Sequence, residues 1–261
     1  MNSKRNNISV FHDRRFAHTD SVCLFLGFLI VVWFLLTRSY AVVGYLHSFD
    51  MLAMSIINVH GTGYADYFFY NISSKLIWLP LILSVIWVVV SGSRDKKRAV
   101  LLIVASILVV VLCDQVSGII KRLVERPRPS HNDNISFLLH YVNGYRGGRF
   151  GFVSSHAANC FGESVWLMLL LRNRKVKLTL FVFSLVVCYS RIYLGVHYPF
   201  DVLAGSCLGI APGVLVYVVC VKTLGRESCI LCDKYNIVSV AAVFTVAMIV
   251  IISAFGVFLP R

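Results

Sequence analysis

Seven apolar stretches constrain the fold of this 261-residue chain more than any other feature of its sequence. A helix needs about 20 mostly apolar residues to cross a bilayer, where every backbone polar group must be bonded internally. Charged residues make up 14% of the chain, whereas soluble domains carry about 25%. We therefore predict an all-α, polytopic membrane helical bundle with about six core transmembrane helices and one extra C-terminal span. The expected spans are residues 22–36, 76–90, 99–116, 157–171, 178–194, 202–221 and 237–259.

Lysine and arginine in the short connections predict the orientation of this bundle. They gather before the first span and in every second connection after it, which puts those segments in the cytoplasm. We expect a basic cytoplasmic leader at 1–20, a transmembrane domain at 21–222, and a cytoplasmic loop with the extra C-terminal helix at 223–261. A cleaved signal peptide is the alternative for the first span, but the long leader favours a retained anchor in the plasma (inner) membrane. The net charge of +13 reflects this bias together with a basic cluster at the candidate site, so nucleic-acid binding is not needed to explain it.

The eight cysteines do not form a disulfide or metal framework. Six of them lie in apolar stretches, where cysteine behaves as a small hydrophobe. Cys229 and Cys232 form a lone CxxC pair in a cytoplasmic loop, two ligands short of a structural zinc site. We therefore expect no bound metal, and the polar residues near the spans become the candidates for function.

The first polar cluster runs from Lys121 to Pro129, at the end of the third span. Lys121 and Arg128 are seven residues apart, which returns to the same face of a helix, and Asp114 lies seven earlier. Pro127 and Pro129 end the helix. Arg128 is therefore expected at the helix exit, where its forked guanidinium can bind two phosphate oxygens. The alternative is a basic patch that binds anionic lipid head groups.

The second cluster, Ser154-Ser155-His156, lies where the fourth span begins. Free backbone N–H groups and the positive end of the helix dipole make a helix N-terminus a natural place for phosphate. Ser154 would add a hydroxyl group, and His156 would give or take a proton. Asn159 and Glu163 follow on the same face, and Glu163 is expected to face the bundle interior. The alternatives are simple helix capping by the serines and a water-bonded, interfacial His156.

The third cluster consists of Ser190-Arg191, five residues, His197, three residues and Asp201. A hydrocarbon environment tolerates such residues only where they face a polar cavity, pair with one another, or take part in chemistry. The four-residue spacing would let Asp201 accept a bond from one imidazole nitrogen of His197 and leave the other as a nucleophile. Arg191 could hold a phosphoryl group. A purely structural histidine–aspartate pair is the alternative.

Together, the three clusters resemble the signature of the type 2 phosphatidic acid phosphatases, a superfamily that also includes glucose-6-phosphatase and the vanadium haloperoxidases. Lys-x6-Arg-Pro and Ser-Arg-x5-His-x3-Asp are present in full, whereas the usual Pro-Ser-Gly-His reads Val-Ser-Ser-His at residues 153–156. The resemblance covers residues 20–222 and leaves the last span outside. It implies catalytic roles for His197, Asp201 and His156, and phosphate binding by Lys121, Arg128, Ser154, Ser155 and Arg191.

The resemblance also implies a two-step phosphoryl transfer that uses no metal and no other cofactor. His197 would attack phosphorus to form a phosphohistidine, with Asp201 orienting it. His156 would protonate the leaving oxygen and then activate water. The implied partners are the lipid bilayer and a membrane lipid phosphate, with no obligate protein partner evident. Because the basic loops are expected inside, we expect the site to face the periplasm or the outside.

The substrate stays open at this stage. Undecaprenyl diphosphate, lipid A phosphates, phosphatidylglycerophosphate and phosphatidate all suit a site at the outer interface. The loop 132–151 is expected to contribute to the choice, because its apolar run 135–139 could enter the interface and Arg146 and Arg149 could reach a second phosphate or an acidic sugar. The alternatives are a phosphatase of soluble or sugar phosphates, a non-catalytic lipid-binding or transport protein, and a vanadate-dependent peroxidase.

Overall fold

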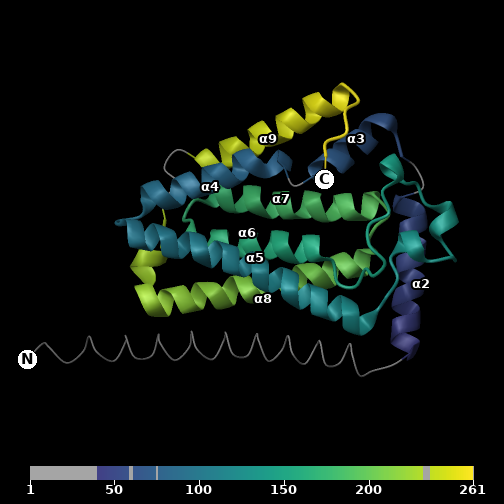
Figure 1. The fold of residues 1–261 in the computed structure, drawn as a ribbon, viewed down its shortest axis with the longest axis horizontal. Helices are drawn as coiled ribbons and strands as arrows, with labels where there is room; N and C mark the ends of the chain where they lie inside the picture. Colours follow the sequence, from purple (N-terminus) through teal and green to yellow (C-terminus); the bar gives the residue numbers. More distant parts are fainter. Residues whose placement is uncertain (1–39, 59–60, 75, 232–235, 261) are drawn as a thin grey trace, which may run out of the picture. The chain divides into compact units, whose positions relative to one another are not determined.

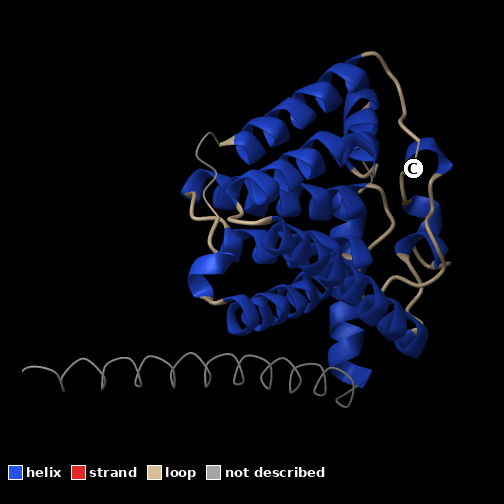
Figure 2. Cartoon of the chain, turned by 60° about the vertical axis from the view of Figure 1, so that its left-hand side comes forward, coloured by secondary structure: helices blue, strands red, loops and turns tan. Residues whose placement is uncertain are grey.

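The computed structural model describes residues 40–58, 61–74, 76–231 and 236–260. Most of these residues are helical, and no strand is present among them (Figure 2). Two isolated β-bridges join Pro127 to Phe150 and Leu171 to Leu231. The expectation of an all-α membrane bundle is therefore confirmed. The first expected span, 22–36, lies outside the described residues.

The long helices of the described chain follow the predicted apolar stretches closely from residue 76 onwards. Four of them, Lys96–Val124, Arg174–Tyr193, Pro199–Leu224 and Ile237–Ala254, are long and apolar enough to cross a membrane, and the bent pair formed by residues 63–72 and 76–92 would make a fifth. The chain is thus a multi-pass membrane protein. In chain order the helices are α2 (Tyr40–Ile57), α3 (Gly63–Ile72), η1 (Leu76–Trp78), α4 (Leu79–Gly92), α5 (Lys96–Val124), η2 (Pro129–His131), η3 (Ser136–Leu138), η4 (Val142–Gly144), α6 (Ser155–Leu170), α7 (Arg174–Tyr193), α8 (Pro199–Leu224), η5 (Arg226–Cys229) and α9 (Ile237–Ala254).

Contacts within the chain separate residues 1–47 from residues 48–261. Of the first unit the structure describes only the start of α2, so the site and its surroundings below all belong to the second unit. The domain boundaries expected after residues 20 and 222 stay predictions.

Helix α6 lies at the centre of the bundle and packs against α5, α7 and α8 (Figure 1). Its contact with α8 is close because Gly205 and Gly209 of α8 lie against the backbone carbonyls of Ser154 and Ala158. A Cβ at either glycine would overlap those carbonyl oxygens, and small residues four apart are what allow two membrane helices to approach in this way. The N-termini of α6 and α8, which both carry predicted site residues, are thereby held together.

Helix α9, which the family resemblance left outside, packs against α3 and α4 (Figure 1). Ile249 of α9 joins Ile72 and Ile77 in a buried apolar cluster. Beyond α9, the side-chain amide of Asn71 donates to the carbonyl of Val257 and accepts from the N–H of Leu259, both at 2.8 Å. The extra C-terminal helix is therefore an integral part of the transmembrane unit.

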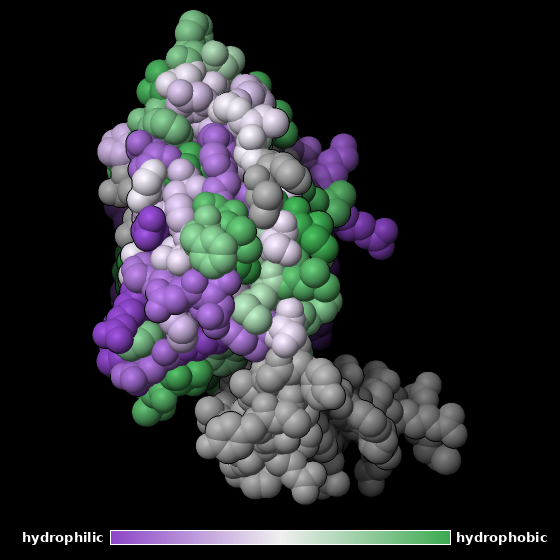
Figure 3. Space-filling view, turned by 90° about the vertical axis from the view of Figure 1, so that its right-hand side faces the viewer, coloured by the Kyte–Doolittle hydropathy of each residue, from purple (hydrophilic) through white to green (hydrophobic). Residues whose placement is uncertain are grey.

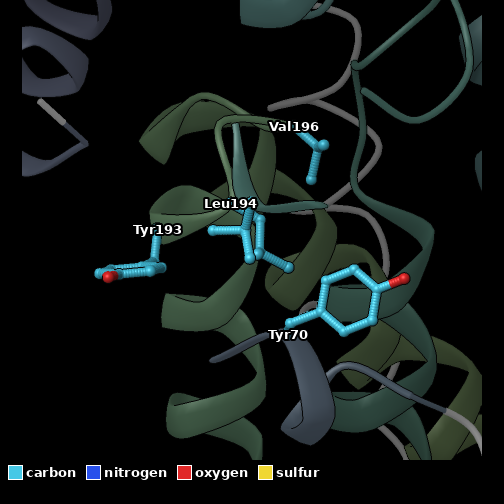
Figure 4. Close-up of a cluster of buried hydrophobic side chains, with 5 residues drawn as sticks. Tyr70, Tyr193, Leu194 and Val196 are labelled. Carbon is cyan, nitrogen blue, oxygen red and sulfur yellow. The ribbon is translucent and has the colours of Figure 1, made fainter. Parts of the chain in front are cut away.

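The connection from α7 to α8 rests on a buried apolar cluster. Tyr193, Leu194 and Val196 lead out of α7 and pack with Tyr70 of α3 and with Val142 (Figure 4). The side chain of Asn58 also donates to the carbonyl of Tyr193 at 2.6 Å. Because buried side chains pack at the density of organic crystals, this cluster gives the residues that follow it a defined position.

Candidate active site

Three segments that are far apart in the sequence meet at one end of the bundle. The amine of Lys121, at the end of α5, donates to the hydroxyl of Ser155. The N–H of Ser154, at the start of α6, donates to the carbonyl of Asp201 at 2.9 Å. Nη1 of Arg128 donates to the carbonyl of Val196, in the connection between α7 and α8, at 3.2 Å. The three predicted clusters therefore form a single site.

His197 lies at the centre of this site and is only 1% exposed. Its burial, together with the nearby positive charges of Arg128, Arg191 and Lys121, holds the pKa of the imidazole well below its usual range. Both effects disfavour the charged form of a histidine. The side chain is consequently neutral at physiological pH, which is the protonation state that a nitrogen nucleophile requires.

Asp201 lies behind His197, but the expected hydrogen bond between the two side chains is not formed. Oδ2 of Asp201 is 3.6 Å from Nδ1 of His197, and this buried nitrogen has no hydrogen-bond partner among the described residues. The carboxylate is engaged elsewhere: Oδ2 accepts from the N–H of Tyr198 at 3.2 Å, which caps α8, and Oδ1 accepts from Nη1 of Arg126 at 2.7 Å. Asp201 thus faces His197 at a distance that a small movement would close.

Arg126 and Asp50 are site residues that the sequence reasoning missed. Arg126 donates through Nη2 to Oδ2 of Asp50 at 2.7 Å while its Nη1 binds Asp201. Two signals were present in the sequence. Arg126 lies in the same basic run as Arg128, and Asp50 is an acidic residue in a mostly apolar stretch, where a carboxylate usually has a functional or pairing role.

Ser154 and Ser155 occupy the N-terminus of α6 as expected, but they do different things there. The hydroxyl of Ser154 caps the helix by accepting from the N–H of Ala157, at 3.5 Å. The hydroxyl of Ser155 lies 2.7 Å from that of Ser117 and accepts from Lys121, so this side chain is directed toward α5. Ser155, which stands where the family motif usually has glycine, therefore anchors Lys121. His156 follows in the first turn of α6, near enough to influence the charge of His197.

Arg128 and Arg191 reach the site from different segments: Arg128 follows the end of α5, and Arg191 lies in the last turn of α7. Nε of Arg128 donates to the carbonyl of Phe150 at 3.0 Å. Burial and the neighbouring Arg191 guanidinium lower the pKa of Arg128 to about 10, which leaves it charged at neutral pH. Arg191 is 1% exposed, donates to the hydroxyl of Ser73, and donates through Nη2 to the hydroxyl of Tyr145 at 3.1 Å. Its Nε has no partner in the described part of the chain.

Glu163 and Asn159 lie deeper in the bundle on α6. Glu163 accepts from the hydroxyl of Ser106 of α5 and faces the interior, as a carboxylate at that depth should. Oδ1 of Asn159 is buried without a hydrogen-bond partner in the described residues. Ser117, which contacts Ser155, also donates to the backbone carbonyl of Asp114.

No group of three His, Cys, Asp or Glu side chains that could hold a metal ion is present in the ranges that the structure describes. Cys229 is buried, and its CxxC partner Cys232 lies outside those ranges. The site instead combines a neutral imidazole, a second histidine, three basic side chains and a helix N-terminus. Such an arrangement can bind a tetrahedral oxyanion and attack its central atom.

Comparison with known proteins agrees with this geometry. The sequence profile described as the PAP2 superfamily matches residues 99–224. The chain is 35% identical to the lipid A 4'-phosphatase of Bacteroides thetaiotaomicron over 184 residues, which cover 70% of this chain and 81% of that protein. It is 34% identical to the lipid A 4'-phosphatase of Porphyromonas gingivalis over 153 residues, 58% of this chain and 64% of that protein. The crystal structure of a transmembrane PAP2-type phosphatidylglycerolphosphate phosphatase from Bacillus subtilis superposes with a TM-score of 0.55 at 25% identity, covering 77% of this chain and 96% of that one.

The fold and these similarities define a membrane-embedded hydrolase of the class that acts on lipid phosphates. The chain belongs to the PAP2 superfamily, the type 2 phosphatidic acid phosphatases, as its three motifs predicted.

Proposed function

We propose that this protein removes a phosphate group from a lipid A-type glycolipid at the outer face of the inner membrane, through a phosphohistidine intermediate. The observation that carries the proposal is the buried, neutral imidazole of His197 among the charges of Lys121, Arg128 and Arg191. The choice of lipid A rests on the similarity to two lipid A 4'-phosphatases. Undecaprenyl diphosphate is the second candidate, because an undecaprenyl-diphosphatase of Bacillus subtilis is 38% identical over 66 residues.

In the first step, Nε2 of His197 attacks phosphorus and the bond between phosphorus and the lipid oxygen breaks. Nδ1 cannot take this role because it faces Asp201. The imidazolium of His156 gives its proton to the departing lipid oxygen. As positive charge develops on the ring of His197, Nδ1–H and Oδ2 of Asp201 draw together into the hydrogen bond that the resting site lacks.

In the second step, water attacks the phosphohistidine. Neutral His156 takes a proton from this water, the bond between phosphorus and Nε2 breaks, and inorganic phosphate leaves. Throughout both steps the charge on the equatorial oxygens is stabilised by Lys121, Arg128 and Arg191, with Ser154 and the free N–H groups of the α6 N-terminus. Ser155 contributes by holding Lys121 in place.

The distribution of lysine and arginine supports an outer location for the site. The short connections 94–98, 172–177 and 222–234 are basic and are expected in the cytoplasm. The ends of α5 and α7 and the N-termini of α6 and α8 lie at the opposite ends of these helices. A periplasmic site would give access to phosphorylated lipids of the outer leaflet.

The loop between α5 and α6 supports a substrate with a large, charged head group. It forms an open hollow of about 560 Å³ lined by Pro127, Ser130, His131, Asp133, Ser136, Arg146 and Arg149. Neither arginine pairs with a carboxylate in the described residues. Phe137 and Leu138, 75% and 51% exposed in the same loop, suit contact with lipid. Hydrophilic and hydrophobic residues gather next to one another on the face shown in Figure 3.

The experiment that tests the proposal measures phosphate release by the purified, detergent-solubilised protein. We expect release from bisphosphorylated lipid A to exceed release from undecaprenyl diphosphate, phosphatidylglycerophosphate and phosphatidate. We also expect it to exceed release from a short-chain soluble phosphate ester. A preference for one of the other lipids would overturn the choice of lipid A, and a preference for the soluble ester would overturn the lipid specificity. Absence of release from every compound would favour a non-catalytic binding protein.

The hollow has its own test within this panel. Replacing Arg146 and Arg149 together by glutamine should raise KM for bisphosphorylated lipid A, with little change for phosphatidate, because only the former carries a second phosphate. Equal changes in KM for both lipids would show that the hollow does not select the substrate.

A further inference from the structure

The carboxylate of Asp201 is held by a bridge that no motif of the sequence describes. We propose that Arg126, anchored by Asp50, is a positioning residue that aims Oδ2 of Asp201 at the imidazole of His197. The proposal rests on the function proposed above, because it assigns Arg126 to the histidine–aspartate pair of that reaction.

The guanidinium of Arg126 spans two buried carboxylates. Nη1 binds Oδ1 of Asp201 and Nη2 binds Oδ2 of Asp50, each at 2.7 Å. Both aspartates are 0% exposed, and the arginine side chain is 17% exposed. The Cζ atom of Arg126 also lies 4.3 Å from the centre of the Tyr198 ring, a cation–π contact that fixes the plane of the fork. A charge-assisted pair of hydrogen bonds from one planar group sets direction as well as distance.

Asp50 is itself immobilised, so it can serve as the anchor of the bridge. Its other oxygen, Oδ1, accepts from the N–H of Phe200 at 3.0 Å, in the first turn of α8. Asp201 caps the same helix end through the N–H of Tyr198. Two carboxylates therefore converge on the N-terminus of α8. Arg126 forms an ion pair with each of them. Without it they would repel each other in a medium of low dielectric constant.

The two oxygens of Asp201 consequently have separate tasks. Arg126 occupies Oδ1 and so leaves Oδ2 as the oxygen that faces Nδ1 of His197, at 3.6 Å. If Arg126 were absent, the carboxylate could rotate, and Oδ2 would lose its direction toward the imidazole. The positive charge that forms on His197 would then lack its partner. A purely structural bridge would stabilise the end of α8 without affecting this step.

Substitution of Arg126 separates these two roles. We expect Arg126→Gln to lower kcat for bisphosphorylated lipid A by about 10- to 100-fold with KM nearly unchanged, by analogy with the groups that orient metal-binding histidines, whose removal costs about that much. Arg126→Lys keeps the positive charge but lacks the planar guanidinium that reaches both carboxylates. We expect this variant to fold normally and to lower kcat by at least about 10-fold. Asp50→Asn, which removes the anchor of Arg126, should also lower kcat. Added guanidinium ion should restore part of the activity of Arg126→Ala, because the small cation can occupy the same place.

Arg122→Gln is the matched control, because it removes the same charge from an exposed residue near the end of α5. Its kcat should equal that of the wild type. Thermal melting in detergent gives the folded fraction, to which every rate is normalised. Wild-type kcat in folded Arg126→Lys, or failure of guanidinium to raise the rate of Arg126→Ala, would overturn the positioning role. These results are distinct from failure of the proposed function, which would appear as no phosphate release by the wild type.

Discussion

Two histidine–aspartate pairs lie at the same end of the bundle in the described part of the chain, and they differ in a way that separates function from structure. His140 and Asp66 are partly exposed, at 33% and 17%, and Nε2 lies 2.9 Å from both carboxylate oxygens. His197 and Asp201 are almost fully buried, yet Nδ1 of His197 and Oδ2 of Asp201 lie 3.6 Å apart. The first pair is a completed hydrogen bond. The second is an incomplete one, with Nδ1 of His197 buried and unpartnered among the described residues.

The surroundings of the two pairs explain the difference. Asp66 also accepts from the hydroxyl of Tyr193 at 2.8 Å, and the backbone of His140 is held by Asn58. These contacts tie α3, the long loop and the end of α7 together. Around His197 the neighbours are cations, which destabilise a second positive charge. A buried polar group without a protein partner calls for an explanation, and a site in which charge develops during the reaction supplies one.

The largest effect is expected for His197→Ala. This change removes the proposed nucleophile, so phosphate release and the acid-labile radiolabel of a phosphohistidine should both fall below detection, while the protein still inserts and melts cooperatively. Turnover near the wild-type rate would exclude His197 as the nucleophile.

The next largest effect is expected from orthovanadate, an analogue of the five-coordinate phosphoryl group. It should inhibit the wild type strongly, because the cations around His197 bind such an anion, whereas EDTA should leave the rate unchanged. Inhibition should persist in His140→Ala, because the His140–Asp66 pair lies outside the proposed catalytic residues. Loss of activity in EDTA that added metal restores would contradict the proposed chemistry.

Acid pH provides a third test, which depends on the low pKa of His197. Formation of the phosphohistidine should not lose its nucleophile as the pH falls through about 6.5, the usual pKa of a histidine, because burial and the nearby cations hold the pKa of the folded imidazole below that value. The unfolded chain takes up that proton, so stability should fall as the pH drops below about 6.5, by up to about 1.4 kcal/mol per pH unit for this one group. His197→Gln should melt with a weaker dependence on pH. An identical dependence in wild type and variant would show that the pKa of His197 is not lowered in the folded protein.

The smallest effect on catalysis is expected for Asp66→Asn and His140→Ala. Each breaks the completed pair, so the protein should lose about 1–3 kcal/mol of stability, the usual cost of leaving a partly buried hydrogen-bonding group unsatisfied. The kcat per folded molecule should stay close to that of the wild type, since this pair joins α3, the long loop and the end of α7 and has no assigned role in the phosphoryl transfer. A loss of kcat comparable to that of Arg126→Gln would mean that the two pairs are not functionally distinct.

The sequence predicted the membrane bundle and the family well because both depend on patterns that are local in the chain. Apolar length alone indicates most spans, and the spacing from Ser190 to Asp201 is specific to one superfamily. The partners of Asp201 could not be predicted in this way. Asp50 and Arg126 are separated from Asp201 by 151 and 75 residues, and no spacing rule connects positions so far apart. Similarly, Ser155 was a departure from the motif in the sequence but is the anchor of Lys121 in the structure.

The sequence by itself determined that the chain folds in a lipid bilayer, the class of its fold, and the chemical identity of the residues around a phosphate. Hydrophobicity and residue type are properties of the chain before it folds. The tertiary structure alone decided which oxygen of Asp201 faces His197, which histidine pair is complete, and that α9 belongs to the transmembrane unit. These are questions of direction and distance between distant segments. They are answered only when the glycines of α8 let it close onto α6 and the Arg126 bridge joins α2 to α8.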